Sequence, residues 1–180
     1  MDYLDVYFCH RFDPETALEE TARAMDDLVR QGKVLYWGTS EWTAAQIEDA
    51  SATCDRRNLH APRVEQPQYN LLERRRVETE IVPVAQARGI GLVTWSPLAS
   101  GVLTGKYDEG VPEGSRLADI AWLRESALAG DRVARVRRMK AVADEAGCSR
   151  TQLALAWTAA QPGVSSVILG VTSERQLDEN

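Results

Sequence analysis

The sequence is short of cysteine, of positive charge and of long apolar runs, and each shortage excludes a class of protein. Its three cysteines, Cys9, Cys54 and Cys148, form no Cys-x-x-Cys pair, so neither a disulfide framework nor a metal site is expected. Acidic residues outnumber basic ones by 27 to 21, for a net charge of −6. That balance disfavours nucleic acid and anionic membranes as partners.

No apolar run approaches the roughly 18 residues of a membrane span, and the first five residues lack the basic start of a signal peptide. We therefore expect a cytoplasmic protein with reduced thiols and no membrane partner. No Gly-x-Gly-x-x-Gly follows any predicted strand, which argues against a Rossmann dinucleotide site. With 180 residues, 44% of them hydrophobic, the chain can form one sizeable core, so residues 1–180 are expected to be a single domain.

Strand and helix patterns alternate along the chain. The expected strands are the apolar runs at residues 6–9, 34–37, 64–68, 90–95 and 166–169. The expected helices are one started by Asp13-Pro14, one opened by the capping box Thr43–Gln46, one near residues 78–88 that Pro83 must kink or delay, one around residues 136–146, and two opened by the capping boxes Ser149–Gln152 and Ser173–Gln176. A loop over residues 97–117 is too long for a mere connector.

This alternation predicts a parallel sheet with right-handed crossovers, either open and doubly wound or part of a closed barrel. A complete eightfold barrel needs about 250 residues, so five strands indicate a piece of one, and the missing glycine fingerprint favours the barrel. Such a piece would expose two strand edges and an unclosed core. We expect poor solubility or self-association, so a second copy of the chain, in a homo-oligomer, is one partner considered.

The ends of the strands would bring six residues to one rim of a barrel. They are His10, Ser40, Gln66, Trp95, Ser96 and Gly170. The long loop adds Lys106 and Arg116, and the helix opening at Ser173 presents unpaired N–H groups. The pattern predicts a ligand whose phosphate end lies near Lys106, with Trp95 placed to stack on a planar ring.

Motifs along nearly the whole chain resemble the NADPH-dependent aldo-keto reductases, in the branch that includes the potassium-channel β-subunits. They are Tyr7–His10, Trp37–Ser40, Gln66–Asn70, Trp95–Leu98, and Gly170 with Gln176–Asn180. The resemblance implies an α/β fold, a TIM-type (β/α)8 barrel, of which this chain holds strands four to eight. The first three strands and the last helices would be missing, and the domain truncated at both ends.

The resemblance also implies the cofactor contacts. Ser40 and Gln66 would bind the nicotinamide carboxamide, and Trp95 would stack on its ring. The pyrophosphate would lie in the loop of Ser96, Pro97, Leu98, Ser100 and Gly101. The adenosine 2′-phosphate would lie among Lys106, Arg116, Thr172 and Gln176, and Glu179 and Asn180 would contact the adenine. Gly170 would be a further cofactor contact. The cationic pair favours NADPH over NADH.

His10 resembles the catalytic histidine that polarises a small-molecule carbonyl substrate. The aspartate, tyrosine and lysine that complete this tetrad lie on the missing strands, so the fragment alone is expected to be inactive. The main hypothesis is an oxidoreductase that reduces aldehydes or ketones. Two alternatives are a non-catalytic NADPH-binding regulatory module similar to a channel β-subunit, and an isomerase or aldolase barrel that binds a sugar phosphate.

Overall fold

The computed structural model describes residues 2–180, and its strands form one five-stranded sheet. The strands are β1 (Leu4–Cys9), β2 (Val34–Ser40), β3 (Val64–Gln66), β4 (Gly91–Thr94) and β5 (Val164–Val167). They lie in the order β1-β2-β3-β4-β5, and β1 to β4 pair in parallel. The Leu92 N–H on β4 donates to the Gly163 carbonyl, which directly precedes β5, at 2.9 Å. The predicted α/β class with a parallel sheet is thus confirmed.

The described chain divides into two compact units. Unit 1 comprises residues up to Gln68 with residues 75–94 and 162–166, and unit 2 comprises residues 69–74, 95–161 and 167–180. The single domain expected for residues 1–180 stays a prediction.

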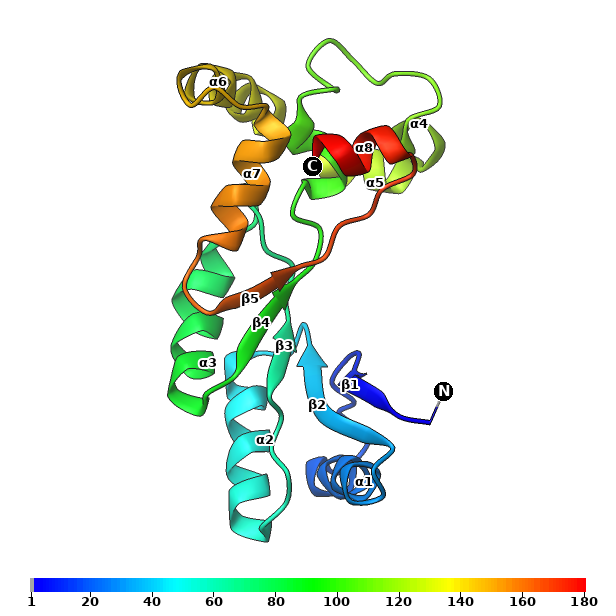
Figure 1. The fold of residues 1–180 in the computed structure, drawn as a ribbon, viewed down its shortest axis with the longest axis vertical. Coiled ribbons are helices and arrows are strands. Elements are labelled where there is room, and N and C mark those ends of the chain that lie inside the picture. The colour runs from blue at the N-terminus through cyan, green and yellow to red at the C-terminus, as the bar shows by residue number, and fades with distance from the viewer. Residues whose placement is uncertain (1) are drawn as a thin grey trace. The chain divides into compact units, whose positions relative to one another are not determined.

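The helices of unit 1 pack along the sheet (Figure 1). They are α1 (Leu18–Arg30), α2 (Ala44–Arg57), the π-helix η1 (Val77–Ile81) and α3 (Val82–Arg88). Ala22 of α1, Trp37 of β2 and Cys54 of α2 form one buried cluster. Burial of these apolar side chains against the sheet stabilises the strand–helix units, and so fixes where the strands end.

Side-chain hydrogen bonds decide where two helices of unit 1 begin. The capping box that opens α2 is confirmed, because Thr43 Oγ1 accepts from the Gln46 N–H while the Gln46 side chain accepts from the Thr43 N–H. The helix predicted after Asp13-Pro14 is present, but its predicted start at these two residues is wrong. The Asp13 carboxylate accepts from the Glu15 N–H at 2.9 Å and from the Thr16 hydroxyl at 2.7 Å, which closes a turn instead, and α1 begins at Leu18.

Pro83 delays its helix, as predicted. The chain enters through the π-helix η1, and the Val82 N–H bonds the Val77 carbonyl, five residues back. Pro83, which has no N–H to donate, then occupies the first turn of α3. The π turn therefore places the proline where a missing donor costs little.

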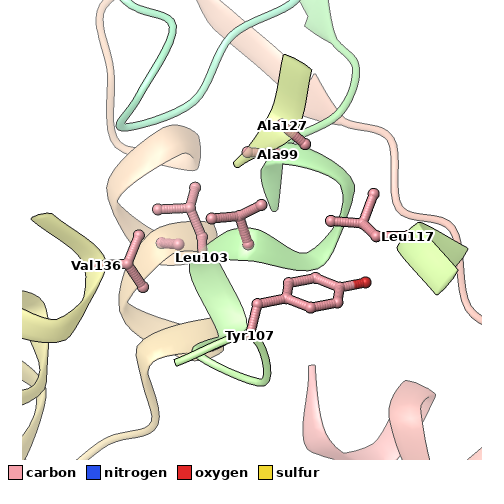
Figure 2. Packing of buried hydrophobic residues seen from close by; sticks show 8 residues of the cluster. Ala99, Leu103, Tyr107, Leu117, Ala127 and Val136 are labelled. Carbon is pink, nitrogen blue, oxygen red and sulfur yellow. The ribbon is translucent and has the colours of Figure 1, made fainter. Parts of the chain in front are cut away.

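Unit 2 contains short helices around its own core. They are the 3-10 helix η2 (Ala99–Thr104), α4 (Arg116–Asp119), α5 (Ala121–Ala127), α6 (Arg132–Glu145), α7 (Arg150–Ala159) and α8 (Glu174–Glu179). Figure 2 shows Leu103, Tyr107, Leu117 and Val136 gathered around η2. The segment expected as a long loop thus folds in part into helices whose apolar side chains line this core.

The C-terminal elements differ from expectation in two details. The expected strand at residues 166–169 lies two residues earlier, because its ladder begins directly at the Gly163 bond to β4. The capping box at Ser149 is confirmed. The one at Ser173 is wrong in one of its two bonds, because the Gln176 side chain accepts from the Thr172 N–H instead of the Ser173 N–H. Within residues 2–180, no helix combines the length and apolar character needed to cross a membrane.

Candidate functional site

In unit 1, Ser40 and Gln66 lie side by side at the carboxyl ends of β2 and β3. They are register partners in the parallel ladder. The buried Ser40 hydroxyl donates to the Gln66 carbonyl at 3.0 Å. The Gln66 side chain stays half-exposed. A hydroxyl and a carboxamide presented together can bind a planar amide, which both donates and accepts hydrogen bonds.

His10 follows β1 directly and is exposed. Arg11, beside it, donates to the His10 carbonyl and, at 3.3 Å, to the Ser40 hydroxyl. Cys9 of β1 pairs with Thr39 of β2 in the ladder. His10 and Ser40 are the next residues after this pair, so both come at the same end of the sheet. The structure therefore brings His10, Ser40 and Gln66 to one edge of the sheet, as the sequence predicts.

Directly below this edge lies a buried carboxyl group that the sequence analysis missed. Glu65 has no exposed surface, and the Thr39 hydroxyl donates to its Oε2 at 2.5 Å. Its Oε1 has no hydrogen-bond partner. Burial raises the pKa of Glu65 to about 7. Its sequence neighbours Val64 and Gln66 gave no signal of this burial.

Glu41 ties the ends of β2 and β3 to the next helix. Its backbone is left-handed, with φ of 59°, an arrangement that costs a residue with a side chain about 1 kcal/mol or more. Its carboxylate accepts from the Gln68 N–H and pairs with Arg76 at 2.6 Å. Glu41, unassigned in the sequence analysis, thus holds the edge at which Ser40 and Gln66 lie.

A small cavity of about 130 Å³ also lies in unit 1. It is lined by Cys9, Arg11, Phe12, Asp13, Thr16, Leu18, Thr21 and Trp42. None of the predicted cofactor contacts lines it. Burial raises the pKa of the Cys9 thiol to about 11, so this cysteine stays protonated and is a poor nucleophile at neutral pH.

In unit 2, the segment from Trp95 to Gly101 forms a tight loop. Trp95 is half-buried, Pro97 is buried, and Leu98 packs against the core. Left-handed backbones occur at Ser96, Ala99, Ser100 and Gly101, with φ from 48° to 89°. Successive turns of this kind can aim backbone N–H groups at an anion.

Asn70 holds this loop, and the sequence analysis did not assign it a role. Its fully buried side chain donates to the Ser96 carbonyl at 3.0 Å. Its Oδ1 accepts from the backbone N–H groups of Leu72 and Glu73, both at 2.9 Å. A lone amide within the apolar run Tyr69-Asn70-Leu71-Leu72 is a signal that could have identified it.

Lys106 lies against the same loop. A Cβ added to Gly101 would come within 2.8 Å of Lys106 Cε and 3.0 Å of its ammonium nitrogen. The end of the lysine side chain therefore lies directly beside the left-handed loop. The Lys106 ammonium also lies 5.1 Å from the centre of the Tyr107 ring. A cation that lies beside this loop suits an anion such as a phosphate.

The remaining predicted contacts of unit 2 form smaller groups. Arg116 is exposed as the first residue of α4, and Gly170 is exposed after β5. Gln176 Oε1 accepts from the Thr172 N–H at 2.8 Å and from the Thr172 hydroxyl at 3.2 Å. The Glu179 carbonyl accepts from the Gln152 side chain at 3.1 Å.

The structure thus brings some of the predicted contacts together in local groups. Ser40 joins Gln66 in unit 1, while Lys106 joins the Ser96–Gly101 loop and Thr172 joins Gln176 in unit 2. Asn180 ends the described chain beside Glu179. That the groups of the two units bind one molecule stays a prediction.

Each group, taken by itself, matches one part of a pyridine nucleotide in kind. The amide-binding pair of unit 1 matches a carboxamide, and the glycine-containing loop and the lysine of unit 2 match phosphate groups. Within residues 2–180, no group of three or more histidine, cysteine, aspartate or glutamate side chains could hold a metal ion.

Comparison with known proteins identifies the family. The model of the aldo/keto reductase family matches residues 1–180. The chain is 51% identical over its whole length to an Arabidopsis thaliana protein named "Probable voltage-gated potassium channel subunit beta", of which it covers 56%. It is 50% identical to an Oryza sativa subsp. japonica protein of the same name, again covering 56%. The chain spans about half the length of these curated relatives. The motifs predicted this family and its channel-subunit branch, and the chain belongs to the aldo/keto reductase family.

Proposed function

We propose that this chain forms strands four to eight of a (β/α)8 barrel that binds NADPH and reduces aldehydes or ketones to alcohols. The family match over residues 1–180 carries the proposal. The sheet, with β1 to β4 parallel, supports it. So does the length of the relatives, of which the chain covers only 56%. The first three strands and the last helices of the barrel would lie outside this chain.

The nicotinamide end of the site would be held by Ser40 and Gln66, with Trp95 against the ring. The bond from the Ser40 hydroxyl to the backbone carbonyl of Gln66 fixes the Ser40 side chain relative to the β3 backbone. Such a pre-set pair loses little conformational freedom when it binds an amide.

The pyrophosphate would be held by the loop of Ser96 to Gly101, and the 2′-phosphate by Lys106, Arg116, Thr172 and Gln176. Glu179 and Asn180 would contact the adenine, and Gly170 would be a further cofactor contact. The packing of Lys106 against Gly101 supports this assignment. A positive charge at this end favours NADPH over NADH.

Bound NADPH would supply the hydride. His10 would donate a hydrogen bond to the carbonyl oxygen of the substrate, where negative charge develops. Its exposed position after β1 leaves its ring available for this contact. The aspartate, tyrosine and lysine of the family's catalytic tetrad would come from the barrel strands outside the chain.

The names of the relatives favour one alternative, a non-catalytic regulatory module. Both are named as subunits of a voltage-gated potassium channel. In such a module, binding of NADPH, not turnover, would carry the function. The two functions share the cofactor site and differ in whether His10 acts on a carbonyl.

A binding titration on the gene product that contains this chain tests the cofactor. We expect Lys106→Ala with Arg116→Ala to weaken NADPH binding by at least about tenfold, because each charged contact to a phosphate contributes about 1.5 kcal/mol or more. NADH binding should change little. The control is Arg138→Ala, which removes an exposed arginine of α6. Failure of the wild-type protein to bind either nucleotide would contradict the proposal.

Turnover then separates the two functions. If NADPH oxidation by an aldehyde falls in His10→Ala while NADPH affinity holds, the protein is a reductase. If the wild type binds NADPH and reduces no carbonyl compound in a broad panel, the regulatory alternative is supported.

A further inference from the structure

We propose that Glu65 is a positioning residue for the nicotinamide end of the site, which keeps Ser40 and Gln66 in place while its carboxyl is neutral and loosens them when it ionises. This inference rests on the proposed function, because Ser40 and Gln66 are carboxamide contacts only if the protein binds NADPH. No motif in the sequence and none of the assigned contacts includes Glu65.

The register of the sheet places Glu65 one step below that pair. Thr39 pairs with Glu65, and the next rung pairs Ser40 with Gln66. The Thr39 hydroxyl bonds Glu65 Oε2 at 2.5 Å, and the Ser40 hydroxyl bonds the Gln66 carbonyl at 3.0 Å. Each of the last two register pairs between β2 and β3 therefore has one side-chain hydrogen bond, and Glu65 accepts the one that lies farther from the strand ends.

The surroundings of Glu65 favour its neutral form. The side chain is fully buried, and Oε1 has no hydrogen-bond partner. An ionised carboxylate with so few donors is costly to bury, which raises its pKa to about 7. A hydrogen bond from the Glu41 backbone favours the charged form but does not offset burial.

The charged groups that act on Glu65 come from two neighbouring segments. The Glu41 carboxylate, after β2, raises its pKa, and Arg76, at the start of η1, lowers it. These two side chains pair with each other at 2.6 Å, so their effects partly cancel. On β4, the register partner Leu92 is apolar, and the buried hydroxyl of Thr94 does not titrate.

Ionisation would reach the cofactor pair through the backbone. β3 has only three residues, and Gln66 is its last. A charge on Glu65 favours any shift of this short strand that brings water to Oε1. The same shift moves the Gln66 carbonyl, to which Ser40 is bonded. The neutral form should therefore bind NADPH more tightly, and affinity should fall as the pH rises through about 7.

The test is NADPH affinity from pH 5.5 to 8.5 in the gene product that contains this chain. Over this range, we expect the NADPH affinity of the wild type to fall by about three- to tenfold more than that of Glu65→Gln. A difference of one unit between the pKa of Glu65 in the free protein and in the NADPH complex corresponds to a tenfold change in affinity. The isosteric amide should keep the tight affinity at high pH. Equal pH dependence in the two proteins would overturn the positioning role.

Two further variants provide a second test and a control for this experiment. Thr39→Val removes the side-chain hydroxyl that bonds Glu65, so the pH dependence should move to higher pH even if Glu65→Gln fails to fold. An unmoved dependence would contradict the role. Glu20→Gln changes an exposed carboxylate of α1 and should leave the dependence as in the wild type.

A spectroscopic readout separates this inference from the proposed function. The infrared band of a protonated carboxyl should be present in the wild type at pH 6, fade by pH 8.5, and be missing in Glu65→Gln. Absence of NADPH binding at every pH would overturn the proposed function and, with it, the positioning role. Binding without a Glu65-dependent pH effect would overturn the positioning role alone.

Discussion

At the scale of single residues, Asp26 is a buried carboxylate with an environment opposite to that of Glu65. Arg30 donates to its Oδ2 at 2.5 Å, and the backbone N–H of His60 donates to Oδ1 at 2.8 Å. The His60 ring nitrogen lies 2.6 Å from the same oxygen. Desolvation acts to raise the pKa of Asp26, but these hydrogen bonds and the Arg30 charge outweigh it and lower the pKa to about 2. The number of donors thus decides the sign of the shift.

Asp26 is expected to make the fold sensitive to acid. Its folded pKa of about 2 lies below the ordinary value of 3.8, so its stabilisation is complete above pH 3.8 and is lost as the pH falls through about 2. At neutral pH this amounts to at most about 2 kcal/mol, because Arg30 and His60 are half-exposed and solvent screens them. Urea unfolding of wild type and Asp26→Asn at pH 7, 4 and 2.5 measures it.

The expected outcome is a stability difference that is largest at pH 7 and shrinks toward pH 2.5. Asp27→Asn, which changes the exposed neighbour on α1, serves as the control and should differ little from wild type. A difference between wild type and Asp26→Asn that stays constant with pH would show that the bonds to Asp26 act without its charge.

At the scale of elements, one glycine fixes how the loop after η2 meets α7. Gly105 has φ of 82° and ends η2. A Cβ at this position would collide with the guanidinium of Arg150. That side chain is 15% exposed and is held by Asp108 at 2.7 Å and by the Val136 carbonyl at 3.3 Å. The guanidinium cannot move aside without losing both contacts.

Gly105→Ala should therefore destabilise the protein by about 2–4 kcal/mol, from left-handed backbone strain of about 1 kcal/mol and from lost charged hydrogen bonds of about 1–3 kcal/mol. Gly114→Ala is the matched control, because Gly114 has φ of 68° with no atom near its added Cβ. Gly114→Ala should lower the stability only by the left-handed backbone strain. Thermal or urea unfolding of both variants measures these losses of stability. Equal losses in Gly105→Ala and Gly114→Ala would show that Arg150 is not held in place.

The element pattern was largely predictable from local signals. The alternation of strands and helices, the capping boxes of α2 and α7, and the delay at Pro83 each depend on residues a few positions apart. The start of α1 was not, because Asp13 can cap a helix or close a turn, and its bonds to Glu15 and Thr16 chose the turn.

The candidate site was predictable where topology alone places a residue. Ser40 and Gln66 follow strands that pair in parallel, so they meet at one edge. Glu65 was not predictable, because its burial depends on what packs over β3 and a glutamate in a strand is more often exposed. Asn70 was within reach, as a single amide in an apolar run, but its bond to Ser96 needs the folded loop.

At the scale of the whole molecule, the sheet leaves apolar surface uncovered. Large apolar side chains on or beside β1 and β2 are exposed by 40–55%: Tyr3, Leu4, Tyr7, Leu35 and Tyr36. β1 is an edge strand with β2 as its neighbour in the sheet. An open edge beside exposed aromatic residues is a template for pairing with another chain.

The 180-residue chain purified on its own should therefore self-associate in a concentration-dependent way, measured by sedimentation velocity. Tyr7→Lys with Tyr36→Lys should shift the population toward monomer, because a charge at Tyr7 on the edge strand opposes strand pairing and a charge at Tyr36 removes exposed apolar surface. Trp122→Lys, which changes a 72% exposed residue of α5, should not. A wild-type chain that sediments as one monomeric species and melts in one cooperative transition would show that β1 needs no cover. Association that persists unchanged in the double lysine variant would place the contact elsewhere, for instance at the exposed residues after β5, Ile168, Leu169 and Val171.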